Sequence, residues 1–324
     1  MSHRARVILS MLTLYIVWGT TYLGIKVGLD AALPPALFSA LRLLPAAAIM
    51  FTIARARGAS LKPSGSALRV VLLVGVLLLV GGQYGTMLAE VFVPSGLSAL
   101  VVAVVPLWIA LAESLLPDMQ RPGRMGWLGL AVGFSGLAIL VTPRLLATGA
   151  SSKDLPGILL QIGATWLWTA GAVYSKRNPV DTDPLVATAW EMLAAGVVTL
   201  IIGTLLGEWG HLTVTPKGAG ALLYLIIFGS CLAFTAFVYA LQHLPASKVM
   251  TYAYVNPVIA VFAGWAAGRI GLVPSEPVSS SMLIGMIVIV AGVAITTSAP
   301  TLPPRRPLAE HPVTEALSAE PSEV

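Results

Sequence analysis

The amino-acid sequence predicts an all-α integral membrane protein, with ten transmembrane helices arranged as two inverted five-helix repeats. Three observations support this fold class: the composition, a series of long apolar runs, and pairs of residues that recur in both halves of the chain. The chain has 324 residues, of which 57% are hydrophobic and 10% charged. A soluble domain carries about 25% charged residues, so the composition excludes an ordinary soluble domain.

Apolar runs of about twenty residues account for most of the chain. A helix of this length matches a hydrocarbon core of about 30 Å, because each helical residue rises about 1.5 Å. The first run is too long, and too closely followed by the second, to be a cleaved signal peptide. If one short run is re-entrant, the chain would have eight or nine spans instead. We place the ten spans at roughly 7–28, 34–54, 69–89, 94–116, 125–143, 156–176, 184–206, 218–241, 246–267 and 281–298.

Pairs of residues recur in the second half of the chain, in the same order and at offsets of 149 to 156 positions. Pro94 and Pro106 lie twelve residues apart, as do Pro245 and Pro257. An internal duplication in an apolar chain is typical of membrane transporters. The other matched pairs are Trp18/Lys26 with Trp168/Lys176, Gly129/Gly136 with Gly285/Gly292, and Pro35/Arg42 with Pro184/Glu191.

The duplication divides the chain into four parts. We expect one five-helix copy over 1–143, an external linker over 144–155 and a second copy over 156–298. The remainder, 299–324, is rich in Pro, Glu and Ser, a composition typical of a disordered tail. We expect this tail to lie in the cytoplasm.

The positions of the basic residues predict how the chain crosses the membrane. Cytoplasmic segments next to membrane spans carry an excess of Lys and Arg. If both termini lie inside, the outer ends hold few basic residues, namely Arg144, Lys153, Lys217 and Arg269. Most of the others fall at cytoplasmic ends. Since each copy has five spans, an odd number, the second copy crosses the membrane in the opposite sense to the first. This topology is an inverted repeat in the cytoplasmic (inner) membrane.

Three segments carry a resemblance to a known family: VWGTTYLGIKVGL, LPASKVMTYAYVNPVIAVFAGW and MGWLGLAVGFSGLAILV. They resemble the EamA family of the drug/metabolite transporter superfamily. The early Trp-Gly, the YVNP segment and the G-x6-G pattern in the final helix of each half occur in the order typical of that family. The resemblance implies ten spans as two inverted repeats. It also implies export of amino acids or related metabolites, by exchange or with proton coupling.

Pro106 and Pro257 fall near the middle of the fourth and ninth spans. Proline removes a backbone donor and clashes with the preceding turn, so a helix kinks or opens there. Membrane proteins tolerate such breaks where helices face a cavity or one another. We therefore interpret the two prolines as hinges beside a central site, with simple packing kinks as the alternative. Asn256, just before Pro257, could bind substrate or cap the open turn.

Trp18 and Trp168 lie near the middle of the first and sixth spans. Because Trp normally lies at the membrane interface, a ring at mid-depth must bury its N–H among partners or face a polar cavity. A cavity lined by aromatic rings and a few hydroxyls suits a neutral or aromatic amino acid. The alternative is that the rings only fill the core of the bundle. Further candidate lining residues are Thr21, Tyr22, Tyr84 and Tyr252.

Arg42 and Glu191 occupy equivalent positions in the two copies, and a charge inside a span indicates function. Each lies about 10 Å below the start of its helix, but these helices start on opposite faces of the membrane. A direct ion pair is therefore not required. Arg42 could bind a substrate carboxylate through two hydrogen bonds, and Glu191 could receive a substrate ammonium or a coupling proton. The alternative is that each is satisfied within the protein and serves packing or topology.

The sequence predicts a carrier that exports small metabolites, with neutral or aromatic amino acids favoured, by alternating access at a mid-membrane site. A multidrug or nucleobase/nucleoside exporter of the same fold is the first alternative, and a membrane protein that transports nothing is the second. The histidines are scattered and no phosphate-binding loop occurs, so we expect no enzyme activity, metal, cofactor or nucleic-acid partner. The expected partners are a small-molecule substrate, the lipid bilayer and protons as a coupling ion. We expect a monomer or a weak homodimer.

Overall fold

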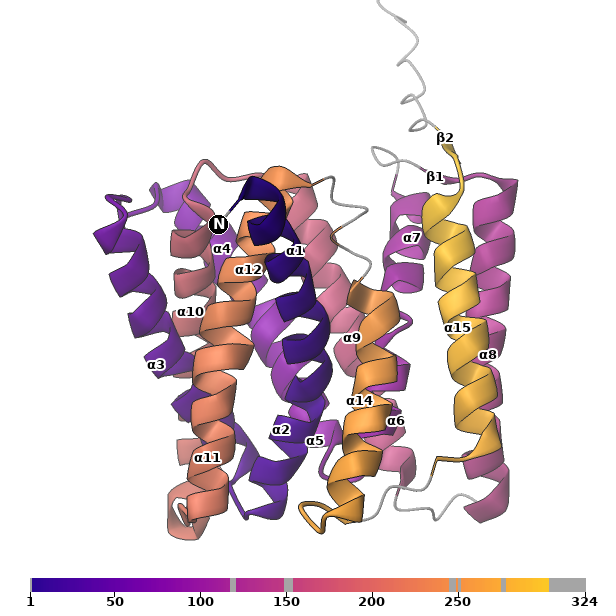
Figure 1. Ribbon diagram of the computed structural model, residues 1–324. Coiled ribbons are helices and arrows are strands. Elements are labelled where there is room, and N and C mark those ends of the chain that lie inside the picture. The colour runs from indigo at the N-terminus through magenta and orange to yellow at the C-terminus, as the bar shows by residue number, and fades with distance from the viewer. Residues whose placement is uncertain are drawn as a thin grey trace, which may run out of the picture.

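Helices account for nearly all of the structure, and they stand side by side with their axes roughly parallel (Figure 1). The computed structural model describes residues 2–116, 121–148, 154–244, 249, 252–274 and 278–302. Pro245, which belongs to one of the repeated pairs, lies outside the described residues, as do the centre of the predicted linker and most of the predicted tail.

The first half of the chain forms helices close to the predicted spans. Three of its five spans are composite, because a π-helical stretch or a short break divides them. The elements are α1 (His3–Thr13), η1 (Leu14–Trp18), α2 (Gly19–Asp30), α3 (Pro35–Ala56), α4 (Gly65–Gly75), η2 (Val76–Tyr84), α5 (Gly85–Ala89), α6 (Ser95–Val102), α7 (Val105–Leu115) and α8 (Arg124–Thr148).

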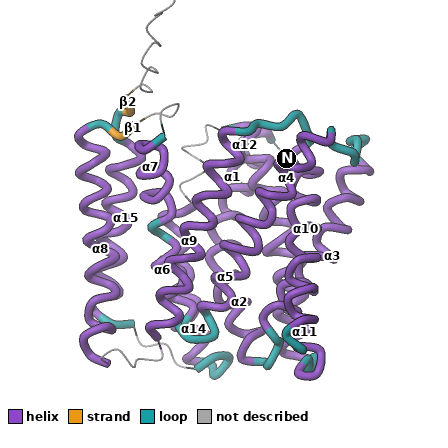
Figure 2. Tube along the Cα trace, turned by 180° about the vertical axis from the view of Figure 1, so that it is seen from behind, coloured by secondary structure: helices purple, strands orange, loops and turns teal. Residues whose placement is uncertain are grey.

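The second half is also almost entirely helical, as the tube in Figure 2 shows from behind. Two short strands, β1 (Arg121–Pro122) and β2 (Thr301–Leu302), pair antiparallel at one end of the bundle. The helices are α9 (Asp154–Arg177), α10 (Pro184–Leu205), the 3-10 helix η4 (Glu208–His211), α11 (Pro216–Tyr224), η5 (Leu225–Leu232), α12 (Ala233–His243), α14 (Tyr252–Arg269) and α15 (Ser280–Ser298).

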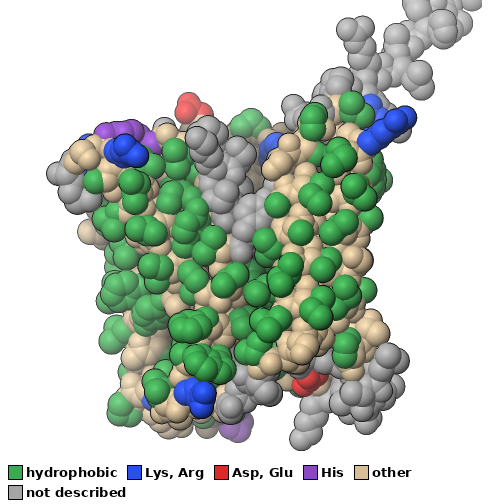
Figure 3. Space-filling view, turned by 45° about the vertical axis from the view of Figure 1, so that its right-hand side comes forward, with side chains coloured by type: hydrophobic (Ala, Val, Ile, Leu, Met, Phe, Trp, Pro, Cys, Tyr) green, Lys and Arg blue, Asp and Glu red, His purple; other side chains and the backbone are tan. Residues whose placement is uncertain are grey.

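The exterior of the bundle is suited to lipid. In the view of Figure 3, hydrophobic side chains cover the side of the molecule, and the charged side chains gather near its two ends. This confirms the prediction of an all-α membrane protein. By length and composition, six helical segments of the described chain could cross a membrane: His3–Asp30, Pro35–Ala56, Gly65–Ala89, Ser95–Ala112, Pro184–Leu205 and Pro216–Phe237.

Helices α8 and α15 pack antiparallel through glycines. A Cβ atom at Gly129 would lie 2.9 Å from the Gly292 carbonyl oxygen, and one at Gly292 would lie 2.8 Å from that of Gly129. Gly136 and Gly285 form the same reciprocal contact, at 3.0 and 3.1 Å. Small residues let helix backbones approach closely within a membrane. These glycines therefore hold one helix of each half in direct backbone contact.

Helices α3 and α10 form a second antiparallel pair. The Leu37 side chain, at the start of α3, lies 2.9 Å from the position of a Cβ at Gly203, near the end of α10. Toward the other end, the Trp190 indole donates a hydrogen bond to the Leu61 carbonyl at 3.0 Å. Both helices begin with Pro at the first turn, where the missing N–H costs nothing.

Glu208 caps the first turn of α3 from the other half of the chain. Its carboxylate accepts hydrogen bonds from the backbone N–H groups of Ala36 at 3.2 Å and Leu37 at 2.8 Å. An anion is favoured at a helix N-terminus, since the first N–H groups have no partner within the helix. The contact fastens the beginning of α3 to the segment that follows α10.

Replacing Glu208 by Ala is expected to lower the free energy of unfolding by about 1–2 kcal/mol, because two backbone donors lose their acceptor. Thermal unfolding of the purified protein in detergent measures the change. Asp181→Ala, at an exposed loop position, is the control and should leave the melting temperature unchanged. Equal melting temperatures for the two variants would contradict a stabilising role for the cap.

Candidate functional site

Carbonyl groups in two π-helical segments accept hydrogen bonds from other helices. The Trp18 indole nitrogen, at the end of η1, donates to the Gly229 carbonyl of η5 at 3.3 Å. The Asn256 amide of α14, oriented so that its nitrogen faces acceptors, donates to the carbonyls of Tyr15 at 3.2 Å and Tyr252 at 3.1 Å. π-helical bulges occur frequently at functional sites. Here they join three helices of the two halves near one place.

Trp18 lies in a cluster of aromatic rings. Its ring centroid is 4.9 Å from Tyr252, 5.3 Å from Phe234 and 5.3 Å from Phe237. Two of these contacts are edge-on, the arrangement that aromatic pairs favour. The structure therefore brings together two of the predicted lining residues, Trp18 and Tyr252, with Asn256 on the same helix as Tyr252. Sequence reasoning missed Phe234 and Phe237, because neither belongs to a residue pair that recurs in both halves of the chain.

Arg42 of α3 is buried, with 2% of its surface exposed. Its Nε donates to the Ser230 hydroxyl at 3.1 Å, whereas its Nη1 is buried without a hydrogen-bond partner. Gly229 leaves room for this side chain, since a Cβ at that position would lie 3.4 Å from Arg42 Nη2 and 3.0 Å from the Thr21 methyl group. An unpaired donor on a buried charge is costly, so Arg42 is a strong candidate for binding an anionic group.

Thr21 and Tyr22 lie on α2 beside Arg42 and the aromatic cluster. The Thr21 hydroxyl donates to the Trp18 carbonyl at 2.7 Å. Tyr22 lies within electrostatic range of Glu90 and Tyr252. These residues connect the guanidinium group to the rings, so the predicted residues Thr21, Tyr22, Arg42 and Tyr252 converge on one region.

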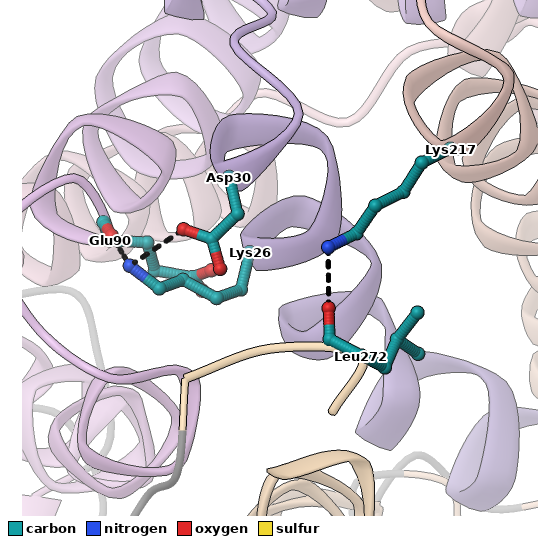
Figure 4. A network of polar contacts seen from close by, with 5 residues as sticks. All are labelled: Lys26, Asp30, Glu90, Lys217 and Leu272. Atoms are coloured by element: carbon teal, nitrogen blue, oxygen red, sulfur yellow. Dashed lines mark hydrogen bonds and ion pairs between the residues drawn. The ribbon is translucent and has the colours of Figure 1, made fainter. Parts of the chain in front are cut away.

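Sequence reasoning missed Glu90, which follows α5 and is fully buried. Figure 4 shows that Lys26 Nζ donates to the Glu90 carbonyl at 3.1 Å and pairs with the Asp30 carboxylate at 3.5 Å. Lys26 thus holds the turn that carries Glu90. In the same view Lys217 donates to the Leu272 carbonyl. An acid just beyond an apolar run is ordinarily taken for an interfacial residue, and only its burial distinguishes Glu90.

A second polar group that the sequence did not indicate lies between α5, α6 and α9. The Gln161 side chain is almost completely buried. Its oxygen accepts from the Ser98 hydroxyl at 2.6 Å, and its nitrogen donates to the Thr86 hydroxyl at 2.9 Å. Because each buried polar atom in this chain of bonds has a partner, the group serves to join the helices.

Three predicted site residues lie elsewhere. The Trp168 ring packs directly on Gly82, where a Cβ would come within 2.7 Å of it. Tyr84 is buried at the end of η2. The Glu191 backbone of α10 faces Gly75 of α4, and no ion pair joins Glu191 to Arg42 among the described residues. The structure thus does not gather these three around the aromatic cluster.

The two prolines differ in their effect on the backbone. The fourth span is interrupted between α6 and α7, and Pro106 is the second residue of α7. By contrast, Pro257 lies within α14, which continues through it. Of the two predicted hinges, only Pro106 therefore lies beside an interruption of its helix.

A pocket of about 510 Å³ opens between α7 and the second half of α9. Ala112 and Leu116 line one side, and Thr169, Tyr174 and Arg177 lie among the residues of the other. None of the described residues that line it belongs to the predicted set. The pocket lies at the end of α9 that the charge pattern predicts to face the cytoplasm.

Comparison with known proteins identifies the family. The model of the EamA-like transporter family matches the chain twice, over residues 5–142 and 155–298. The chain belongs to this family. The uncharacterized inner membrane transporter YedA of Escherichia coli strain K12 is 34% identical, over 95% of this chain and 96% of YedA. The uncharacterized transporter YoaV of Bacillus subtilis strain 168 is 24% identical, over 90% of this chain and 97% of YoaV.

A solved crystal structure shares the fold of this EamA-like protein. Its TM-score is 0.63, with 23% sequence identity, over 90% of this chain and 97% of the other. The resemblance seen in the sequence is confirmed, and the protein is a membrane transporter of the drug/metabolite type. These relationships leave the transported substrate open.

Removing the indole N–H of Trp18 tests its bond to Gly229. Trp18→Phe keeps a ring in the aromatic cluster but deletes the donor, so we expect unfolding to become easier by about 1 kcal/mol. Thermal unfolding in detergent measures this. Trp127→Phe on the exposed face of α8 is the matched control. A Trp18 variant as stable as this control would show that the hydrogen bond contributes nothing.

Proposed function

We propose that this EamA-like protein exports small metabolites across the cytoplasmic membrane, with neutral or aromatic amino acids as the favoured substrates. The observation that carries this proposal is the buried guanidinium of Arg42, whose Nη1 has no hydrogen-bond partner. Its neighbour Thr21 is hydrogen-bonded to Trp18 of the aromatic cluster. A carboxylate would supply the missing acceptor, and an apolar or aromatic side chain would find rings to pack against.

The proposed architecture has ten spans in two inverted repeats, with both termini in the cytoplasm. The reciprocal contacts Gly129–Gly292 and Gly136–Gly285 support it, because exchanging the two halves converts one contact into the other. The π-helical segments support it too: η2 begins at Val76 and η5 at Leu225, 149 positions later. An offset of 149 also relates Pro35 to Pro184.

Alternating access would then arise from movement of one repeat against the other. The break before Pro106 and the Pro257 segment are the proposed hinges. Asn256 would tie α14 to η1 in the state described here, through its bond to the Tyr15 carbonyl. We propose Glu191 as the carrier of a coupling proton. Trp168 and Tyr84 remain proposed substrate-binding residues.

Transport by purified protein in liposomes tests this function. Vesicles loaded with radiolabelled amino acids, nucleosides or a cationic dye should release one class faster than protein-free vesicles. We expect the amino acids to be released, and Trp18→Ala to slow them. Release of only nucleosides or the dye would favour the alternative exporters. A preparation that moves no solute of the panel would contradict the amino-acid assignment.

Proton coupling is tested separately by imposing a pH gradient across the same vesicles. If Glu191 carries the coupling proton, the gradient accelerates transport by the unmodified protein but not by Glu191→Gln. The control is Asp181→Asn, which changes a carboxylate at an exposed loop position. Equal responses of the unmodified protein and Glu191→Gln to the gradient would remove Glu191 from this role.

A further inference from the structure

Two charged side chains of the described chain are fully buried, and they carry opposite charges. Arg42 is 2% exposed and Glu90 is 0% exposed. They come from different helices, since Arg42 lies on α3 and Glu90 follows α5. Their charges are close enough to interact. Burying a single ion costs several kcal/mol, and an ionisable group within a membrane is a functional candidate by default.

The surroundings hold both charges in place. Ser230 fixes Arg42 through the Nε hydrogen bond of 3.1 Å. Lys26 fixes the turn after α5, because its ammonium donates to the Glu90 carbonyl at 3.1 Å while pairing with Asp30. Lys26 therefore acts as a positioning residue. The Glu90 carboxyl group also lies within electrostatic range of Tyr22 of α2.

Arg42 retains binding capacity on the side away from Ser230. Its Nη1 is buried with no hydrogen-bond partner, so a ligand that brings an acceptor satisfies it. Tyr22 lies within electrostatic range of both Glu90 and Tyr252, so the acid and the aromatic cluster share this neighbour. A ligand that bound between them would have a positive group, a negative group and aromatic rings as its neighbours.

We infer that Glu90 is a specificity-determining residue, which together with Arg42 selects small zwitterions: the substrate carboxylate binds Arg42 and the substrate ammonium binds Glu90. This inference rests on the proposed export function and assigns the ammonium group to Glu90, the acid that lies with Arg42, rather than to Glu191. A ligand with one charge would interact favourably with only one of the two buried groups, so it should bind less tightly than a zwitterion.

A matched set of ligands tests the inference by binding to the full-length protein in detergent. L-phenylalanine, 3-phenylpropionate and phenethylamine share one ring and differ only in carrying both charges, the carboxylate alone or the ammonium alone. Leucine with 4-methylpentanoate and isopentylamine repeats the design without an aromatic ring. Affinities come from quenching of tryptophan fluorescence and from thermal shift.

The unmodified protein should bind at least one zwitterion about tenfold to a hundredfold more tightly than either singly charged analogue. Glu90→Gln should lose this preference over the des-amino acid but keep its affinity for the acid itself. Glu90→Asp retains the charge and should keep a weaker preference, which separates loss of charge from loss of folding. Asp181→Asn, at an exposed position, should behave like the unmodified protein.

The inference is overturned if no zwitterion exceeds its analogues in the unmodified protein, or if Glu90→Gln keeps the preference. It is also overturned if Glu191→Gln, rather than Glu90→Gln, abolishes it. Failure of this inference differs from failure of the proposed function. Liposomes that still export a nucleoside, a dye or a singly charged solute would show a transporter without a zwitterion site.

Discussion

Replacing Arg42 by Gln is expected to reduce transport of carboxylate-bearing substrates by about tenfold to a hundredfold, since a charge-assisted hydrogen bond contributes about 1.5–3 kcal/mol. The guanidinium is buried, is fixed by Ser230 and has an unused donor at Nη1. Glutamine retains a polar group but no charge. Initial rates of uptake into liposomes, measured over a range of substrate concentrations, separate an increase in KM from a decrease in maximal rate.

Two further variants test whether the loss of transport comes from the Arg42 guanidinium group. Arg42→Lys keeps the charge but not the planar fork of donors, so an intermediate loss is expected. Arg57→Gln, at an exposed position after α3, is the control and should transport normally. Transport by Arg42→Gln at the normal rate and KM, in a correctly folded preparation, would show that the arginine serves only packing or topology.

Replacing Gly292 by Ala is expected to destabilise the protein by about 2–3 kcal/mol, the usual cost of overpacking a tightly packed contact. The new methyl group would collide with the backbone nitrogen and Cα of Gly133, and it would lie 2.8 Å from the Gly129 carbonyl oxygen. Backbone atoms cannot turn aside as a flexible side chain can. Helices α8 and α15 must therefore separate, which should lower the melting temperature in detergent by about 5 °C or more.

Gly163→Ala is the matched control for this substitution. Gly163 lies in α9, and a Cβ there would have no neighbour within 4 Å. Since Ala has the higher helix propensity, this control should be neutral or stabilising by up to about 1 kcal/mol. If both variants melt at the same temperature, the close approach of α8 and α15 does not contribute to stability.

The helices and their ends could be read largely from the sequence. Predicted spans such as 184–206 and 156–176 agree closely with α10 (Pro184–Leu205) and α9 (Asp154–Arg177), because apolar length, Pro at the first turn and basic residues at the last are local signals. The π-helical segments could not be predicted. They keep the same apolar composition as an α-helix, and their altered hydrogen bonds leave no mark on the pattern of residue types.

The candidate site could be predicted only in part. The recurring residue pairs, and the depth of Trp18 and Arg42 within their predicted spans, indicated two residues that the structure brings near one another. Trp168 and Glu191 were selected as their counterparts, yet they pack against Gly82 and Gly75. The repeat relates positions along the chain, but the helices around those positions differ between the halves. Glu90 was missed because a carboxylate at the end of an apolar run ordinarily faces water.

The sequence by itself determined the helical membrane class, the approximate spans and the family. Each depends on composition and on local order along the chain, which a bilayer of fixed thickness and a helix of fixed rise translate directly into structure. Only the tertiary structure decided that Arg42 and Glu90 lie buried within reach of each other's charge. They are 48 positions apart, and their meeting depends on how separate helices pack, which no local pattern specifies.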